Sequence, residues 1–229
     1  MKNKSETTEF LTDMIEKIDA LPFVNQKNAF FLLLAMHFAG VIGLSMENTR
    51  ELFQLLTPFN LLASAAIVLH FEAEKSKPYY YFILVCFSIG YGMEVIGVKT
   101  GVIFGEYSYG ATLGFKLFNV PLLIGVNWIM LSYATRVTAQ FFTKSPLPIA
   151  IFASLMMVSL DLLIEPVAIQ YDFWEWTNGY IPIQNYMAWF IISFVIQLIG
   201  LRLVPILNNQ LAIRLLILEV VFFACLNFI

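Results

Sequence analysis

Seven runs of mostly apolar residues follow one another along the chain, and short polar segments separate them. A helix that crosses the hydrocarbon core of a bilayer needs about 20 such residues. The runs have about this length and cover residues 28–46, 53–71, 79–98, 117–135, 147–165, 186–204 and 211–228. The pattern predicts an all-α integral membrane protein with about seven transmembrane helices, and residues 28–229 are expected to form one transmembrane domain.

Residues 1–27 have a different pattern. Their apolar residues recur at helical spacing, with charged residues between them; these are Phe10, Leu11, Met14, Ile15 and Ile18. A helix with one apolar and one charged face lies in the plane of a membrane surface. This segment is therefore predicted to be an amphipathic surface helix.

The basic residues predict the orientation of the helices. With seven spans, Arg50, Lys99 and Lys116 lie on one side of the membrane, and the other ten of the 13 Lys and Arg residues, Arg136 among them, lie on the amino-terminal side. Basic residues are enriched on the cytoplasmic side. The amino terminus is therefore predicted inside, and the carboxyl terminus outside.

Composition agrees with a membrane location. Hydrophobic residues make up 59% of the chain and charged residues 13%, and the net charge is −3. This balance excludes nucleic acid as an expected partner and leaves membrane lipid. The chain is expected to be a multi-pass protein of the cell (cytoplasmic) membrane.

Two of the predicted outer connections are long and aromatic. They cover residues 99–116 and 166–185, and they are rich in Trp, Tyr, Phe and Gly. Long loops with such a composition are more often functional than disordered. Trp is also common at membrane interfaces, so Trp174 and Trp176 are candidates for either pocket lining or interface anchoring.

Three carboxylates lie near these connections. Glu94 precedes the end of its predicted span by about four residues, or roughly 6 Å. Asp161 lies at a similar depth on another span, and Glu165 follows one turn later on the same helix face, before Pro166, which is expected to end that helix. Ionisable groups at membrane depth are costly and usually face the bundle interior. Glu94 and Asp161 are therefore expected to form a catalytic pair of one protonated acid and one charged carboxylate.

A fourth predicted span enters from the same side. It carries Asn127 and Trp128 about ten residues, or roughly 15 Å, from its start. Asn127 joins the three carboxylates as a candidate catalytic residue. No cofactor site is expected in the sequence, and no metal site.

An ordered set of residues in the second half of the chain resembles a known family. The set consists of Glu94, Gly97, Thr100, Gly101, Gly105, Tyr107 and Tyr109, then Pro121, Asn127 and Trp128, then Asp161, Glu165 and Pro166, then Trp174, Trp176, Gly179, Tyr180, Pro182, Asn185, Tyr186 and Trp189. This set is similar to that of the membrane carotenoid-biosynthesis family that includes carotenoid 1',2'-hydratases and bisanhydrobacterioruberin hydratase. The resemblance covers about residues 80–200.

The resemblance implies an enzyme that adds water to the terminal isoprenoid double bond of an acyclic carotenoid end group and forms a tertiary alcohol. The implied partners are an acyclic or monocyclic carotenoid and water, and association with other carotenoid enzymes stays open. The implied substrate-binding residues are Trp128, Thr100, Tyr107, Tyr109, Trp174, Trp176 and Asn185.

Two alternatives remain at this point. A carotenoid end-group cyclase begins with the same protonation of an alkene, so the same acids and aromatic residues would serve it. A small membrane transporter or pigment-binding protein could use the carboxylates as a proton relay.

Overall fold

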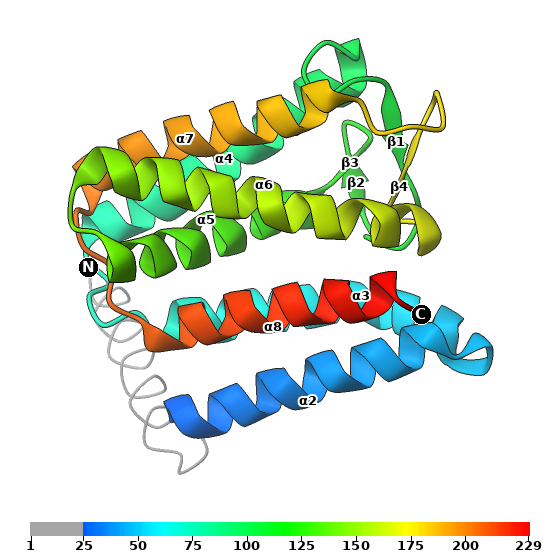
Figure 1. Ribbon diagram of the computed structural model, residues 1–229, viewed down its shortest axis with the longest axis horizontal. Helices are drawn as coiled ribbons and strands as arrows, with labels where there is room; N and C mark the ends of the chain where they lie inside the picture. Colours follow the sequence, from blue (N-terminus) through cyan, green and yellow to red (C-terminus); the bar gives the residue numbers. More distant parts are fainter. Residues whose placement is uncertain (1–24) are drawn as a thin grey trace, which may run out of the picture.

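The computed structural model describes residues 25–229, and seven long helices dominate this part of the chain (Figure 1). The helices are α2 (Gln26–Ser45), α3 (Glu47–His70), α4 (Lys77–Thr100), α5 (Leu122–Phe142), α6 (Pro146–Gln170), α7 (Ile183–Leu203) and α8 (Gln210–Asn227). Each of the seven apolar runs contributes one of them, so the all-α prediction is confirmed. The predicted surface helix lies outside the described residues, except that α2 already begins at Gln26, two residues before the expected start.

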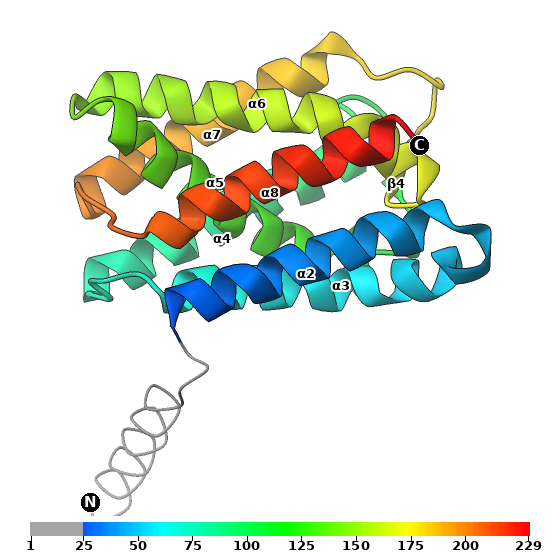
Figure 2. The same ribbon diagram turned by 60° about the horizontal axis from the view of Figure 1, so that its bottom comes forward.

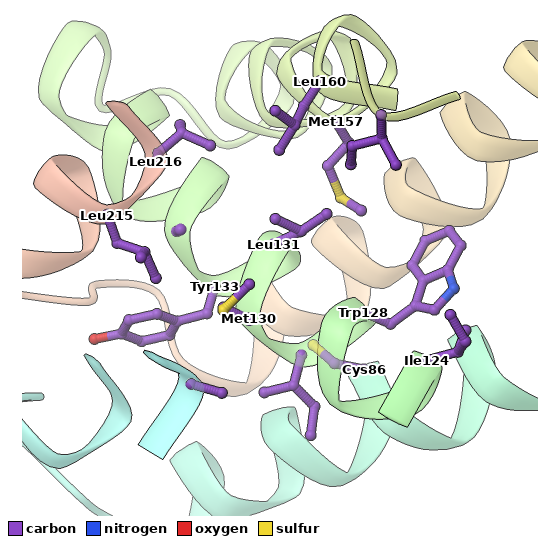
Figure 3. Close-up of a cluster of buried hydrophobic side chains, with 14 of the residues drawn as sticks. Cys86, Ile124, Trp128, Met130, Leu131, Tyr133, Met157, Leu160, Leu215 and Leu216 are labelled. Atoms are coloured by element: carbon purple, nitrogen blue, oxygen red, sulfur yellow. The ribbon is translucent and has the colours of Figure 1, made fainter. Parts of the chain in front are cut away.

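Six of these helices are long and apolar enough to cross a membrane, and α5 is the exception. α5 contacts α3, α4, α6, α7 and α8, so most of its surface faces protein. Figure 3 shows Leu131 of α5 in the core beside Met157 and Leu160 of α6. Because α5 is surrounded, it can bury the polar side chains of Ser132 and Arg136 without exposing them to lipid. The six apolar helices are those of a multi-pass membrane protein.

The helices form two packed groups (Figures 1 and 2). α4, α5, α6 and α7 pack against one another, and α2 packs against α3 and α8. α5 and α6 connect the groups through contacts with α8, and α5 also contacts α3. α2 begins and α8 ends at opposite ends of the bundle, and all four short strands of the described residues lie at the end where α8 finishes (Figure 1). We call this the ribbon end.

The start of α5 differs from the prediction. The expected span covered residues 117–135, but residues 116–121 form a hairpin of β2 (Lys116–Leu117) and β3 (Val120–Pro121). Phe118 and Asn119 have φ angles of 53° and 66°, as both central residues of a tight two-residue hairpin turn require. The helix therefore begins five residues later, and Arg136, which was assigned to a connection on the amino-terminal side, lies inside it.

The end of α6 also differs from the prediction, because Pro166 does not stop this helix. α6 continues to Gln170, and the backbone N–H of Tyr171 then donates to Val167. Proline removes one backbone hydrogen bond from a helix interior. Val167 and Ala168 are fully buried, and we attribute the continuation of the helix to their packing.

A second two-stranded ribbon joins the two long connections. β1 (Tyr107–Tyr109) pairs antiparallel with β4 (Trp174–Trp176). Gly110 continues this pairing by donating its N–H to Phe173, and a Cβ on Gly110 would lie 2.2 Å from the carbonyl oxygen of Asp172. Only glycine allows the two connections to approach this closely.

The opposite end of the bundle carries a separate polar network. Tyr133 donates to Glu72 over 2.5 Å, and Asn209 donates to both Tyr133 and the carbonyl oxygen of Val68. These bonds connect the end of α3 and the start of α8 with the middle of α5. We interpret this network as structural, because the candidate chemistry lies at the ribbon end.

Candidate active site

The β1–β4 ribbon places four aromatic side chains on one face. Tyr107 lies opposite Trp176, and Tyr109 lies opposite Trp174. Successive residues of a strand point to opposite faces, so the exposed Ser108 and Glu175 between them point away. The ring centroids of the two pairs are 5.2 Å and 6.0 Å apart. The aromatic face closes over the ends of α4 and α6.

Glu94 of α4 lies under the tyrosines. Its Oε2 accepts hydrogen bonds from Tyr107 at 2.5 Å and Tyr109 at 2.7 Å, and its Oε1 accepts one from the indole N–H of Trp128 at 3.1 Å. Glu94 is 3% exposed. Burial raises the pKa of Tyr107 and of Tyr109 well above the usual tyrosine value, and Glu94 raises it further when it is ionised. Both hydroxyls therefore stay protonated at neutral pH.

Glu165 of α6 lies under the tryptophans. Its Oε2 accepts from the indole N–H of Trp174 at 3.0 Å and of Trp176 at 2.8 Å. The amide nitrogen of Asn185 donates to Glu165 Oε1 at 3.1 Å and to Asp161 Oδ2 at 2.8 Å. One asparagine at the start of α7 thus connects two buried carboxyl groups that lie one turn apart on α6.

A small space, which we call the carboxylate chamber, lies between these groups. Its volume is about 20 Å³, and the residues that line it are Glu94, Phe104, Tyr107, Tyr109, Ile124, Asn127, Glu165, Trp174, Trp176, Asn185 and Trp189. A polar cavity of about this size holds one water molecule. The chamber therefore combines two carboxyl groups, aromatic faces and space for one water.

A much larger space, which we call the chain cavity, adjoins the chamber. Its volume is about 520 Å³, and it lies between α2, α3, α5, α6 and α8. Ile124, Asn127 and Trp174 line both spaces, so the two meet there. Leu56 and Phe59 of α3 line the chain cavity while being 42% and 65% exposed, which places its open side on the exposed surface of α3.

The chain cavity also has a polar pair in its wall. His37 Nε2 of α2 lies 3.3 Å from Glu219 Oε1 of α8, and His37 Nδ1 lies 2.7 Å from the carbonyl oxygen of Leu33. A carbonyl oxygen only accepts, so Nδ1 carries a proton. Nε2 and Glu219 must then share a further proton. This pairing could not be predicted from the sequence, because the two residues lie 182 positions apart.

The structure brings most of the predicted site residues together. Glu94, Glu165, Asn127, Tyr107, Tyr109, Trp174, Trp176 and Asn185 line the chamber. Asn127 lies about five residues, or roughly 8 Å, inside α5, because this helix starts later than predicted.

Three predicted site residues lie elsewhere. Asp161 is behind Asn185, and Trp128 is behind Glu94, where its ring stacks on Trp189 at 4.5 Å. Thr100 is exposed at the end of α4, and its hydroxyl donates to the carbonyl oxygen of Ile96. Thr100 is therefore not brought to the chamber.

Sequence reasoning missed three lining residues, Phe104, Ile124 and Trp189. Trp189 carried a usable signal, since it follows Asn185 by four residues and so shares its helix face. Within residues 25–229, no group of three or more His, Cys, Asp or Glu side chains is arranged to hold a metal ion.

Comparison with known proteins identifies the family. The family model described as "Carotenoid biosynthesis protein" matches residues 53–229. The chain belongs to this family. The matched part of this carotenoid biosynthesis protein begins within α3, so it includes every chamber residue and leaves out α2.

A curated relative of this carotenoid biosynthesis protein is bisanhydrobacterioruberin hydratase from Haloarcula japonica. The two are 30% identical over 122 residues, which is 48% of this chain and 40% of the relative. The match thus spans about two-fifths of the relative's length. No solved structure matches the chain.

Proposed function

We propose that this protein is a hydratase that adds water to the terminal isoprenoid double bond of an acyclic carotenoid end group and forms a tertiary alcohol. The observation that carries the proposal is the junction of the two spaces. A chamber with carboxyl groups and space for one water adjoins an apolar cavity of about 520 Å³ and shares Asn127 and Trp174 with it. The apolar cavity suits a long hydrocarbon chain, whose end would meet the chamber at Asn127 and Trp174.

The chamber has the groups that alkene hydration needs. Protonation of a trisubstituted alkene gives a tertiary cation, which must be protected from bulk water until one water attacks it. Aromatic faces stabilise a desolvated cation by about 2 kcal/mol, and Trp174 and Trp176 face the chamber. Fixed negative charge in a water-poor site stabilises a cation further. Proton transfer by a positioned carboxyl group then completes the reaction.

The family supports a carotenoid as the substrate, and the relative supports hydration as the reaction. We infer an acyclic or monocyclic carotenoid with at least one open end group. Neither the acid nor the aromatic residues distinguish hydration from cyclisation, because both reactions pass through the same cation. The product of the wild-type protein distinguishes them.

We further infer that all seven helices cross the cell membrane, with the amino terminus inside. Glu94 lies six residues, or roughly 9 Å, from the end of α4, so the chamber lies just within the membrane at the ribbon end. A carotenoid is about as long as the hydrocarbon core is thick, roughly 30 Å. One end of the substrate can therefore reach the chamber while the rest stays in apolar surroundings.

The test is expression in hosts that produce lycopene or γ-carotene, followed by mass spectrometry of the pigments. The expected result is a pigment heavier by one water. A pigment of unchanged mass with a new ring would show a cyclase instead. An unchanged pigment that co-purifies with the protein would favour a pigment-binding protein.

A further inference from the structure

The two carboxyl groups that line the chamber have different kinds of hydrogen-bond partner. Both acceptor bonds on Glu165 Oε2 come from indole N–H groups, of Trp174 and Trp176. An indole N–H donates and cannot accept. A proton on this oxygen would therefore face two donors, and at least one bond would be lost.

The other oxygen of Glu165 is constrained in the same way. It accepts from the amide nitrogen of Asn185, which also donates to Asp161. Because two carboxyl oxygens face this part of the side chain, the NH₂ group is the end that satisfies both. All three partners of Glu165 thus favour its ionised form.

Glu94 has partners that tolerate a proton. Its Oε2 is bonded to the hydroxyl groups of Tyr107 and Tyr109. A hydroxyl group both donates and accepts. When Oε2 carries a proton, it donates to one tyrosine oxygen while the other tyrosine still donates to it. Trp128 remains bonded to Oε1 in either state.

Asp161 does not contact the chamber or the hydroxyl groups that bond to Glu94. It is absent from the lining of the chamber, and the one side-chain hydrogen bond that it makes within residues 25–229 connects it to Asn185. Its Oδ1 is buried and has no polar partner among the described residues. Asp161 is therefore a positioning residue, which holds Asn185 and, through it, Glu165.

We propose that Glu94, with Tyr107 and Tyr109, supplies and recovers the proton of the reaction, and that Glu165 stays ionised and stabilises the cation. Two carboxyl groups that face one small chamber do not both ionise readily, so one of them retains a proton. The difference in partners assigns that proton to Glu94. This inference rests on the proposed function for its substrate, but the proton assignment itself concerns the protein alone.

With Glu94 as the proton donor, the atoms and charges of the proposed hydration balance. The carboxyl proton of Glu94 moves, directly or through a tyrosine hydroxyl, to the less substituted alkene carbon, whose π electrons form the new C–H bond. The tertiary cation forms opposite the charge of Glu165. A lone pair of the water oxygen forms the C–O bond, and the excess proton on that oxygen returns to the Glu94 carboxylate. One water is consumed, and Glu94 is regenerated.

The first experiment needs no substrate. Infrared spectra of the purified protein in H₂O and D₂O at neutral pH identify protonated carboxyl groups by their C=O stretch. We expect one protonated component to disappear in Glu94→Gln and to remain in Glu165→Gln and in Glu175→Gln. Glu175→Gln is the matched control, because this exposed glutamate lies on the outward face of the same ribbon. Loss of the component in Glu165→Gln, or its retention in Glu94→Gln, would overturn the assignment.

The second experiment measures hydrated product per amount of folded, membrane-inserted enzyme. Glu94→Gln should lose on the order of 10²- to 10⁴-fold in rate, as expected for a general acid. In the double variant Tyr107→Phe and Tyr109→Phe, the pH at which activity falls should move upward, because the Glu94 carboxylate has lost two donors. An unchanged pH profile in that variant would contradict the role of the tyrosines.

The two proposals fail in distinguishable ways. If wild-type protein forms a ring or no product, the hydratase proposal fails, and the infrared result still tests the proton assignment. If wild-type protein makes the hydrated pigment but the protonated component belongs to Glu165, the hydratase proposal stands and the assignment is wrong.

Discussion

At the scale of single residues, Asn185 determines which of the three carboxyl groups line the chamber and which one is kept out of it. Depth along α6 alone predicts that the deeper Asp161 would be coupled to Glu94. The structure instead places Asn185 between Asp161 and the chamber, and Glu165 lines the chamber. Spacing along one helix could show that Asp161 and Glu165 share a face. It could not show which of them the start of α7 would cover.

We therefore expect the substitution Glu165→Gln to cost more activity than Asp161→Asn. Glu165→Gln removes the charge that we propose stabilises the cation, so it should lower the rate on the order of 10²-fold. Asp161→Asn changes a group that acts through Asn185 and should cost about 10-fold, as outer-shell partners typically do. The measurement is hydrated product per folded enzyme for each variant. A larger loss in Asp161→Asn would restore the depth-based prediction.

The buried tyrosines predict a second residue-level effect. Free tyrosine ionises near pH 10, whereas the pKa of Tyr107 and of Tyr109 is raised by burial and by Glu94. Above about pH 10 the folded state thus binds more protons than the unfolded state. The stabilisation that these groups contribute is complete below about pH 10 and is lost as the pH rises further.

Ultraviolet titration of tyrosine checks this prediction. In folded protein, wild type and the double variant Tyr107→Phe and Tyr109→Phe should give equal tyrosinate absorbance between about pH 9 and 11. In denatured protein, the variant should give less tyrosinate absorbance than wild type over the same pH range. A difference between the two folded proteins would mean that these hydroxyls ionise normally.

At the scale of elements, the β1–β4 ribbon is the feature that the sequence did not reveal. Each strand has three residues, and the strands lie in connections that are separated by α5 and α6. Apolar periodicity detects long helices well, but it has no signal for three residues that pair across such a separation. The spacing of two residues between Tyr107 and Tyr109, and between Trp174 and Trp176, was visible in the sequence as a motif. Only the pairing of β1 with β4 explains this spacing, because residues two apart on a strand point to the same face.

The backbone hydrogen bonds between β1 and β4 also show how closely the aromatic side chains of the two strands approach each other. Thr177 donates its N–H to Glu106, and Gly110 donates to Phe173, so hydrogen-bonded pairs flank the two aromatic pairs. Antiparallel pairs alternate, which makes Ser108 and Glu175 the central hydrogen-bonded pair and puts the aromatic residues at the closer, non-bonded positions.

Ser108→Pro should therefore reduce activity strongly. Proline lacks the N–H of the central pair and should shift the tyrosines against the tryptophans. A misplacement of about 1 Å can cost about 10²-fold in rate. Ser108→Thr is the control, since it keeps the N–H and points outward, and it should retain activity. Full activity of a folded, inserted Ser108→Pro protein would show that the ribbon does not position the site.

At the scale of the whole molecule, the seven apolar runs predicted the number of long helices in residues 25–229, and the lateral arrangement came only from the structure. A hydropathy pattern specifies how long a helix is and how apolar its residues are. It does not specify which helix lies in the middle, and α5 is central although it is the one of these seven helices that is not apolar enough to be a candidate span. The division into two groups, with the chain cavity between them, follows from this packing.

The orientation is testable by cysteine labelling. In a background of Cys86→Ala and Cys225→Ala, a cysteine at exposed Glu175 should react with an impermeant maleimide added to intact cells. A cysteine at exposed Lys75, in the connection at the opposite end, should react only after the membrane is opened. The reverse pattern would put the chamber on the cytoplasmic side.

The exposed position of Leu56 and Phe59 on the wall of the chain cavity has a consequence for the proposed hydratase and its substrate. If the protein acts as we propose, a carotenoid dissolved in the bilayer can enter sideways past α3 and never has to pass through the aqueous phase. The concentration that governs turnover is then the number of carotenoid molecules per lipid, and the volume of the surrounding solution does not enter. Extra lipid fused into the same membrane would slow the enzyme by dilution in two dimensions, although the amounts of enzyme and carotenoid in the sample are unchanged.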